Sequence, residues 1–191
     1  MHIVTQVGYL GLFVIVFFES FPLTFFLPGD SLLFTVGFLS SQNILNIWIA
    51  VPLIFLAGVL GYLFSYSLGQ KIILKFFTDE NARYFKPKYV RYTKDFYEKY
   101  GDKTLILGRF VPFVRSFAAA LAGMVNFRYK KFVWYTLLGA AVWSVLVTTL
   151  GFYLGKLIPS ADKYITPIVL AIIVISVLPS AWEYYKQRKN G

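Results

Sequence analysis

Four charged side chains lie within or beside long apolar blocks of this 191-residue sequence: Glu19, Asp30, Arg109 and Arg115. A charge at the centre of a bilayer costs ~2.5–3.5 kcal/mol on insertion scales, so such residues are expected to have a partner and a function. Three simpler roles compete with a functional one: Glu19 at a membrane interface, arginines whose head groups reach the membrane surface, and ion pairs that only fasten the chain. The spacing of the charges favours a functional site.

Arg109 and Arg115 are six residues apart, with Pro112 between them. On a straight helix the two would point ~120° apart, whereas a proline turn lets both face one cavity. Two guanidinium groups in one cavity suit a phosphate, because each can bind two of its oxygens. Asp30 directly follows Pro28-Gly29, and carboxylates taken out of water can bind protons near neutral pH. The arginines and the two acids therefore form a minimum set for proton-linked movement of an anion.

The composition places these residues in an all-α integral membrane protein. The chain is 58% hydrophobic and 15% charged, against ~45–50% and ~25% in soluble domains. It has no cysteine and one histidine, His2, which excludes disulfides and thiolate catalysis and leaves little for a metal or Ser–His site. We therefore expect no enzyme activity, no metal and no cofactor. The net charge of +10 does not indicate nucleic-acid binding, because basic cytoplasmic segments of a membrane protein account for most of it.

Uncharged blocks of the sequence predict the spanning helices, since ~20 apolar residues cross a bilayer. The first block has no signal-peptide cleavage pattern and predicts a retained helix. The polar centre has tyrosines at helical spacing, which predicts an amphipathic helix at the membrane surface or packed on its own protein. These expected elements are a helix at 3–18 extended to about Phe21, spans at 44–69, 132–155 and 164–182, and the amphipathic segment 70–103.

Two further apolar pieces, 21–39 and 104–127, are interrupted by proline and glycine. If each enters the membrane and returns on the same side, fifteen basic residues face the cytoplasm and only Lys156 and Lys163 lie outside. This arrangement satisfies the positive-inside rule far better than two crossings do. It makes both pieces re-entrant hairpins that turn at Pro28, Gly29 and Pro112, enter from opposite faces and meet near the midplane. It also places the C-terminus in the cytoplasm.

The order of parts predicts an internal repeat. At an offset of 86 residues, positions 36–72 give seven identities in thirty-seven, among them Gly37 with Gly123 and Gly69 with Gly155. Each half runs from a broken hairpin through a short polar turn to a long helix. We therefore expect one transmembrane domain over 1–191, an inverted-repeat bundle with two opposed re-entrant hairpins. The first repeat covers about 20–72 and the second about 104–158.

The sequence resembles the DedA family, also called the SNARE-associated or VTT-domain family, over roughly residues 15–156. The piece Gly108-Arg109-Phe110-Val111-Pro112-Phe113-Val114-Arg115 is fairly specific when Ala-Gly and Gly-Ala-x-x-Trp follow it. One departure is Gly61-Tyr62, where many relatives carry Gly-Asp. The other matching residues are Glu19, Leu27-Pro28-Gly29-Asp30, Ala122-Gly123-Met124, Phe132, Gly139-Ala140, Trp143 and the run 150–155.

The resemblance implies a multi-pass protein of the bacterial cytoplasmic membrane that moves a lipid phosphate, with undecaprenyl phosphate as the first candidate. It implies proton coupling through Glu19 and Asp30 and substrate binding through Arg109 and Arg115. The expected partners are therefore a polyprenyl phosphate or another anionic lipid, and protons; a second copy of the chain is a further candidate. The alternatives are a non-selective phospholipid scramblase, which needs no proton gradient, and a small-ion/proton antiporter.

Overall fold

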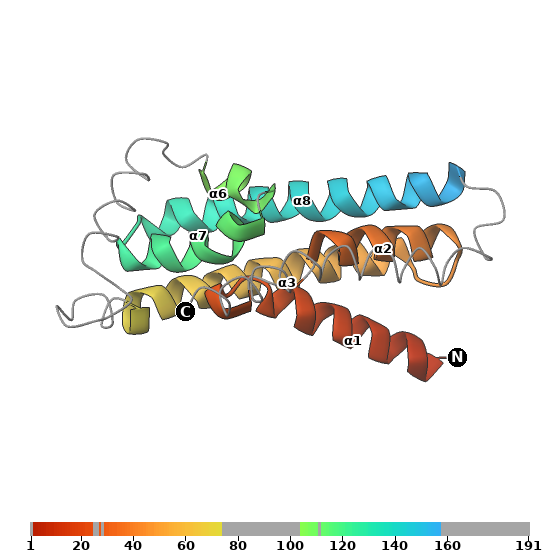
Figure 1. Cartoon of the computed structure of the whole chain (residues 1–191), viewed down its shortest axis with the longest axis horizontal. Helices are drawn as coiled ribbons and strands as arrows, with labels where there is room; N and C mark the ends of the chain where they lie inside the picture. Colours follow the sequence, from red (N-terminus) through yellow and green to blue (C-terminus); the bar gives the residue numbers. More distant parts are fainter. Residues whose placement is uncertain (1, 25–26, 28, 74–103, 111, 158–191) are drawn as a thin grey trace, which may run out of the picture. The chain divides into compact units, whose positions relative to one another are not determined.

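In a computed structural model of the chain, the structure describes residues 2–24, 27, 29–73, 104–110 and 112–157. Every regular element in this part is helical (Figure 1). Pro28, the predicted span 164–182 and nearly all of the predicted amphipathic segment lie outside the described residues. The elements are α1 (His2–Phe18), α2 (Gly29–Ser41), α3 (Ile47–Leu68), α6 (Thr104–Leu107), α7 (Pro112–Met124), α8 (Tyr129–Leu157), the 3-10 turns η1 (Pro22–Thr24) and η4 (Gly108–Phe110), and the π-helical turn η2 (Gly69–Ile73).

Two helices are long and apolar enough to cross a membrane. One runs through α3 over Ile47–Lys71 with a mean hydropathy of 2.3, and the other is α8 with a mean hydropathy of 1.8. Their 25 and 29 residues correspond to ~38 and ~44 Å of helix, against a hydrocarbon core of ~30 Å. The helices predicted at 44–69 and 132–155 are therefore confirmed as continuous helices.

The two interrupted pieces contain short helices. Both α2 and α7 have 13 residues, or ~20 Å of helix, which is shorter than the hydrocarbon core. The turn η1 lies before α2, and the turn η4 lies directly before α7. A helix thus begins at Gly29 and another at Pro112, two of the predicted turn residues, whereas entry and return on one face of a membrane stays a prediction.

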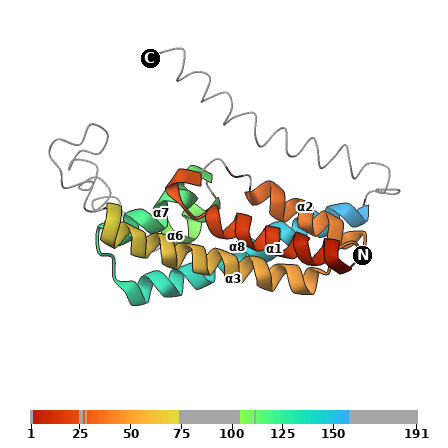
Figure 2. The same cartoon turned by 90° about the horizontal axis from the view of Figure 1, so that it is seen from below.

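The described residues cluster into two compact units, and each is considered separately. The first contains the described residues 2–15, 27, 29–54 and 144–157. In it α2 packs on the C-terminal part of α8, as the views in Figures 1 and 2 agree. A Cβ on Gly37 would lie 1.9 Å from the carbonyl oxygen of Thr148, and one on Gly151 would lie 2.2 Å from that of Phe34. Only glycine permits this approach of the two backbones.

The second unit contains the described residues 16–24, 55–73, 104–110 and 112–143. In it α7 packs on the C-terminal end of α3 and on η2, again through close contacts at glycines. A Cβ on Gly123 would lie 2.0 Å from the carbonyl oxygen of Tyr66, and one on Gly69 would lie 2.0 Å from that of Ala120. Each unit therefore combines the short helix of one predicted repeat with the long helix of the other.

The two short helices also end in the same way. Asn43 after α2 and Asn126 after α7 adopt left-handed backbone conformations, with φ angles of 59° and 51°. Asparagine tolerates this region better than most residues. In each case the next amide donates across the cap, Ile44 to the Leu39 carbonyl at 3.1 Å and Phe127 to the Ala122 carbonyl at 2.9 Å. Equal length, equal caps and equal glycine contacts support the internal repeat, while its inverted orientation stays a prediction.

Candidate functional site

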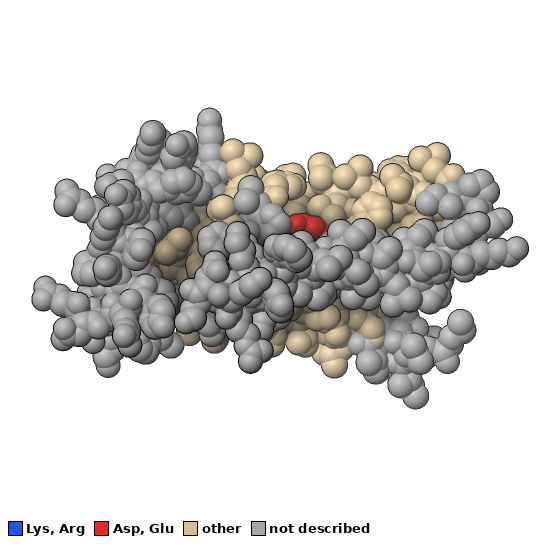
Figure 3. Space-filling view, in the orientation of Figure 1, with Lys and Arg blue, Asp and Glu red and all other residues tan. Residues whose placement is uncertain are grey.

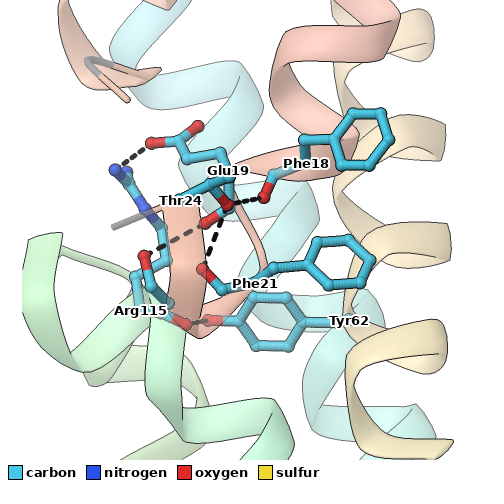
Figure 4. Close-up of polar contacts among 7 residues, drawn as sticks. Phe18, Glu19, Phe21, Thr24, Tyr62 and Arg115 are labelled. Carbon is cyan, nitrogen blue, oxygen red and sulfur yellow. Dashed lines mark hydrogen bonds and ion pairs between the residues drawn. The ribbon is translucent and has the colours of Figure 1, made fainter. Parts of the chain in front are cut away.

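The second unit holds a buried ion pair between Glu19 and Arg115. Glu19 lies in the turn after α1, and Arg115 lies in the first turn of α7. Their exposed fractions are 2% and 3%. An Arg115 Nη2 donor contacts the Glu19 Oε1 atom (Figure 4). Since a buried charge is tolerated only with a partner, each side chain stabilises the other in this position.

Hydrogen bonds from side-chain hydroxyls to backbone carbonyls hold the segments that carry this pair. The Ser116 hydroxyl donates to the carbonyl oxygen of Glu19 at 3.1 Å. The hydroxyl of Tyr62, on α3, donates to the carbonyl oxygen of Arg115 at 3.0 Å. Thr24 closes the turn after α1 by donating to the carbonyl oxygens of Phe18 and, at 3.1 Å, Phe21 (Figure 4). The carboxylate and the guanidinium are therefore both fixed relative to α3.

Arg109 is held in a different way. It lies in the turn η4 and is 1% exposed. Its Cζ atom lies 3.6 Å from the centroid of the Tyr62 ring, and its Nη2 atom lies 3.5 Å from the Gly58 carbonyl oxygen, a long contact. A desolvated cation–π contact stabilises a guanidinium by about 2 kcal/mol. Among the described residues no carboxylate pairs with Arg109, and its buried Nε atom has no hydrogen-bond partner there.

Small and aromatic residues of α8 complete the surroundings. A Cβ on Gly139 would lie 3.1 Å from the Cδ atom of Arg109, so this glycine leaves room for the arginine. The Cζ atom of Arg115 lies 5.0 Å from the ring centroid of the buried Trp143. Within this unit the described titratable side chains nearest the site are thus two guanidinium groups, one carboxylate and the phenol of Tyr62. With Glu19 ionised the site has a net charge of +1.

The structure brings together three of the four predicted site residues. Glu19, Arg109 and Arg115 lie in one compact unit, whereas Asp30 belongs to the other. Asp30 lies in the first turn of α2 and is partly exposed. Its proton-coupling role and the approach of the two hairpin tips therefore stay predictions. Gly29 is the first residue of α2 and Pro112 the first of α7, a position where proline fits because its missing N–H has no helical acceptor.

Sequence reasoning missed the contacts of Tyr62, Gly58 and Trp143. Tyr62 attracted notice only as a departure from a family pattern, and nothing in its type indicates that it contacts both arginines. The four-residue spacing of Gly58 and Tyr62 places them on one face of α3, which is the signal that could have linked them. This spacing becomes informative only when the position of Arg109 in the fold is known.

One face of the described part of the chain shows little charge. On the face drawn in Figure 3 the described residues are uncharged except for a small acidic area, and no basic side chain shows there. No group of three or more His, Cys, Asp or Glu side chains that could hold a metal occurs among the described residues. Among the described basic side chains, Arg109 and Arg115 are buried, whereas Lys71, Arg128, Lys130, Lys131 and Lys156 are exposed.

Comparison with known proteins places the chain in a family. The VTT domain profile matches residues 27–153, which is well over half of the chain. The chain belongs to the VTT-domain, or DedA, family. It is 40% identical to Protein DedA of Escherichia coli strain K12 over 184 residues, covering 95% of this chain and 84% of that protein.

Two more distant relatives are named as membrane proteins. An uncharacterized membrane protein of Mycobacterium leprae is 36% identical over 180 residues, covering 93% of this chain and 81% of its own length. The inner membrane protein YqjA of Escherichia coli strain K12 is 30% identical over 171 residues, covering 89% and 77%. No solved structure matches the chain. The DedA family protein described here is therefore a membrane protein with apolar transmembrane helices.

Proposed function

We propose that this DedA family protein transports a lipid phosphate, with undecaprenyl phosphate as the first candidate, across the bacterial cytoplasmic membrane in a proton-linked cycle. The observation that carries the proposal is the unequal pairing of the two buried arginines. Arg115 has the carboxylate of Glu19 as its partner, whereas Arg109 contacts only neutral groups among the described residues. A phosphate ester supplies the additional negative charge that two guanidinium groups and one carboxylate require.

Glu19 links binding to protons in this proposal. A phosphate first binds Arg109, because no described carboxylate pairs with this arginine and has to be displaced. A proton that binds the Glu19 carboxylate removes its charge and breaks its ion pair with Arg115. Arg115 then donates to the phosphate oxygens in place of Glu19. Release reverses the order: the proton leaves Glu19, the ion pair forms again and the phosphate departs. Asp30 is proposed as a second proton site.

Proton movement has a physical use for such a transporter. An anionic lipid that moves inward travels against the usual membrane potential, at ~2.3 kcal/mol per charge per 100 mV. A proton carried with the lipid cancels one charge of this cost. The polyprenyl tail would stay in the bilayer while its head group passes the buried arginines. The short helices α2 and α7 support the proposed re-entrant hairpins, because neither is long enough to cross the hydrocarbon core.

The test is flux in proteoliposomes. Geranyl phosphate is placed in both leaflets, and its exposure on the outside is followed with an added phosphatase that cannot cross the membrane. We expect wild-type flux to rise when an imposed pH gradient drives protons with the lipid. Arg115→Ala and Glu19→Gln should give the slow exposure of protein-free liposomes. Arg128→Ala removes an exposed arginine and should leave flux unchanged.

The same assay separates the alternative functions. A scramblase would expose geranyl phosphate equally with and without the gradient, and would also move a zwitterionic phospholipid. A small-ion antiporter would leave geranyl phosphate in place and instead change the pH inside the liposomes. Unchanged flux with Arg115→Ala would reject the proposed site.

A further inference from the structure

Tyr62 ties both arginine-bearing segments to α3. It is fully buried, its ring lies 3.6 Å from the Arg109 Cζ atom, and its hydroxyl donates to the Arg115 carbonyl oxygen at 3.0 Å. The close-up shows the hydroxyl end of Tyr62 directed at the backbone of Arg115 (Figure 4). The ring of Phe132 stacks with that of Tyr62, and their centroids are 6.5 Å apart. One residue therefore sets the position of two charges.

The chemistry of the contact between the Tyr62 ring and the Arg109 guanidinium matters as much as the position of Tyr62. The described residues contain two acids, Glu19 and Asp30, and only Glu19 belongs to this unit. An aromatic ring attracts a guanidinium through its quadrupole and leaves the charge of the guanidinium intact. A carboxylate in the same place would attract it more strongly and neutralise it. Tyr62 thus holds Arg109 in its buried position without placing a countercharge beside it.

We propose that Tyr62 is a specificity-determining positioning residue, which holds Arg109 against its ring so that the guanidinium remains available to an anionic head group. This inference rests on the proposed function. It defines the substrate class more closely: with the Glu19–Arg115 pair intact, the site offers one net positive charge. Such a site favours lipids with net negative charge, such as phosphate monoesters, over zwitterionic phospholipids that carry their own ammonium group.

The decisive comparison is Tyr62→Asp against Tyr62→Asn. Both variants lose the ring and the hydroxyl and have nearly the same shape, but only aspartate places a carboxylate beside Arg109. Binding of geranyl phosphate to the detergent-solubilised full-length protein is measured by isothermal titration calorimetry at pH 7.5, with geraniol as the uncharged control. We expect Tyr62→Asp to bind at least about tenfold more weakly than Tyr62→Asn. Equal affinities would overturn the inference.

A second pair covers the case in which these polar variants fail to fold. Tyr66 lies one turn further along α3, is 2% exposed, donates its hydroxyl to the Phe127 carbonyl oxygen at 2.6 Å and stacks on Phe132, as Tyr62 does. No described arginine contacts its ring. Tyr62→Leu should weaken geranyl phosphate binding about tenfold, and Tyr66→Leu should lower thermal stability without changing the affinity. Equal losses of affinity in the two variants would assign Tyr62 a purely structural role.

The outcomes also separate this inference from the proposed function. Wild-type protein that binds geranyl phosphate no better than geraniol would overturn both. Wild-type binding that survives in Tyr62→Asp and Tyr62→Leu would overturn the role of Tyr62 and leave the phosphate site standing.

Discussion

Replacing Glu19 with glutamine removes the carboxylate that pairs with Arg115 while keeping the shape of the side chain. Both partners are at most 4% exposed, so water cannot take the place of the lost charge. Loss of one partner from a buried ion pair destabilises a protein by about 3–5 kcal/mol. A glutamine oxygen can still accept from Arg115, so we expect the lower end of that range. By the scaling for soluble domains of this length, about 3 kcal/mol corresponds to a fall of about 6–12 °C in unfolding temperature.

Phosphate ligands should reverse this loss. In the variant, Arg115 faces a neutral amide oxygen, which an anion displaces more easily than it displaces a carboxylate. Geranyl phosphate should therefore raise the unfolding temperature of Glu19→Gln more than that of the wild type, and geraniol should raise neither. The assay is thermal unfolding in detergent micelles, followed by intrinsic tryptophan fluorescence, because Trp143 is buried beside Arg115.

A double variant controls for the loss of the ion pair itself. Glu19→Gln combined with Arg115→Met removes both charges, so it should be more stable than Glu19→Gln alone and should not respond to geranyl phosphate. The reasoning is refuted if Glu19→Gln unfolds within about 2 °C of the wild type, or if the ligand stabilises the single variant and the wild type equally.

Three further predictions concern the frame of the site. Gly123→Ala places a Cβ 2.0 Å from the Tyr66 carbonyl oxygen and should destabilise the protein by about 1–3 kcal/mol in thermal unfolding, whereas Gly11→Ala, with nothing within 4 Å, should not. Ser116→Ala removes the hydrogen bond to the Glu19 carbonyl and should lose about 1 kcal/mol of stability; the matched change Ser67→Ala, at an exposed serine, should have little effect. Asn126→Ala forces a left-handed φ of 51° on alanine and should lose about 1 kcal/mol, while Asn126→Gly should retain the wild-type unfolding temperature.

Much of the site could be predicted because charge in an apolar segment is costly and therefore conspicuous. The sequence predicts that Glu19, Asp30, Arg109 and Arg115 come together. Glu19, Arg109 and Arg115 lie in one compact unit, whereas Asp30 belongs to the other unit and its approach stays a prediction. The partner of Arg109 was missed for the opposite reason. A tyrosine in an apolar helix is ordinary in composition, and only the folded chain shows the ring of Tyr62 beneath a guanidinium.

The presence of the two long helices followed from apolar runs, but the exact ends of the helices did not: the first, expected to reach about Phe21, ends at Phe18. The helix expected from residue 44 begins at Ile47, because the Asn46 side chain accepts the amide of Trp48 at 2.9 Å and caps the helix. The helix expected from 132 begins at Tyr129, since exposed lysines at 130 and 131 are compatible with a helix although they interrupt the apolar run.

The packing partners of the short helices could not be read from the sequence. The contacts of Gly37 with Thr148 and of Gly123 with Tyr66 join residues far apart in the chain. Small residues recur throughout both halves, so their positions alone do not say which pairs meet. The repeat predicts that the two halves of the sequence resemble each other. The structure adds that each compact unit contains helices from both halves.

The most direct test of the central claim is an experimental structure of the protein in lipid nanodiscs with geranyl phosphate bound. The account predicts phosphate oxygens within about 3 Å of guanidinium nitrogens of both Arg109 and Arg115, with Glu19 no longer paired to Arg115. A phosphate bound elsewhere, with the Glu19–Arg115 pair intact and Arg109 still covered only by Tyr62, would contradict it.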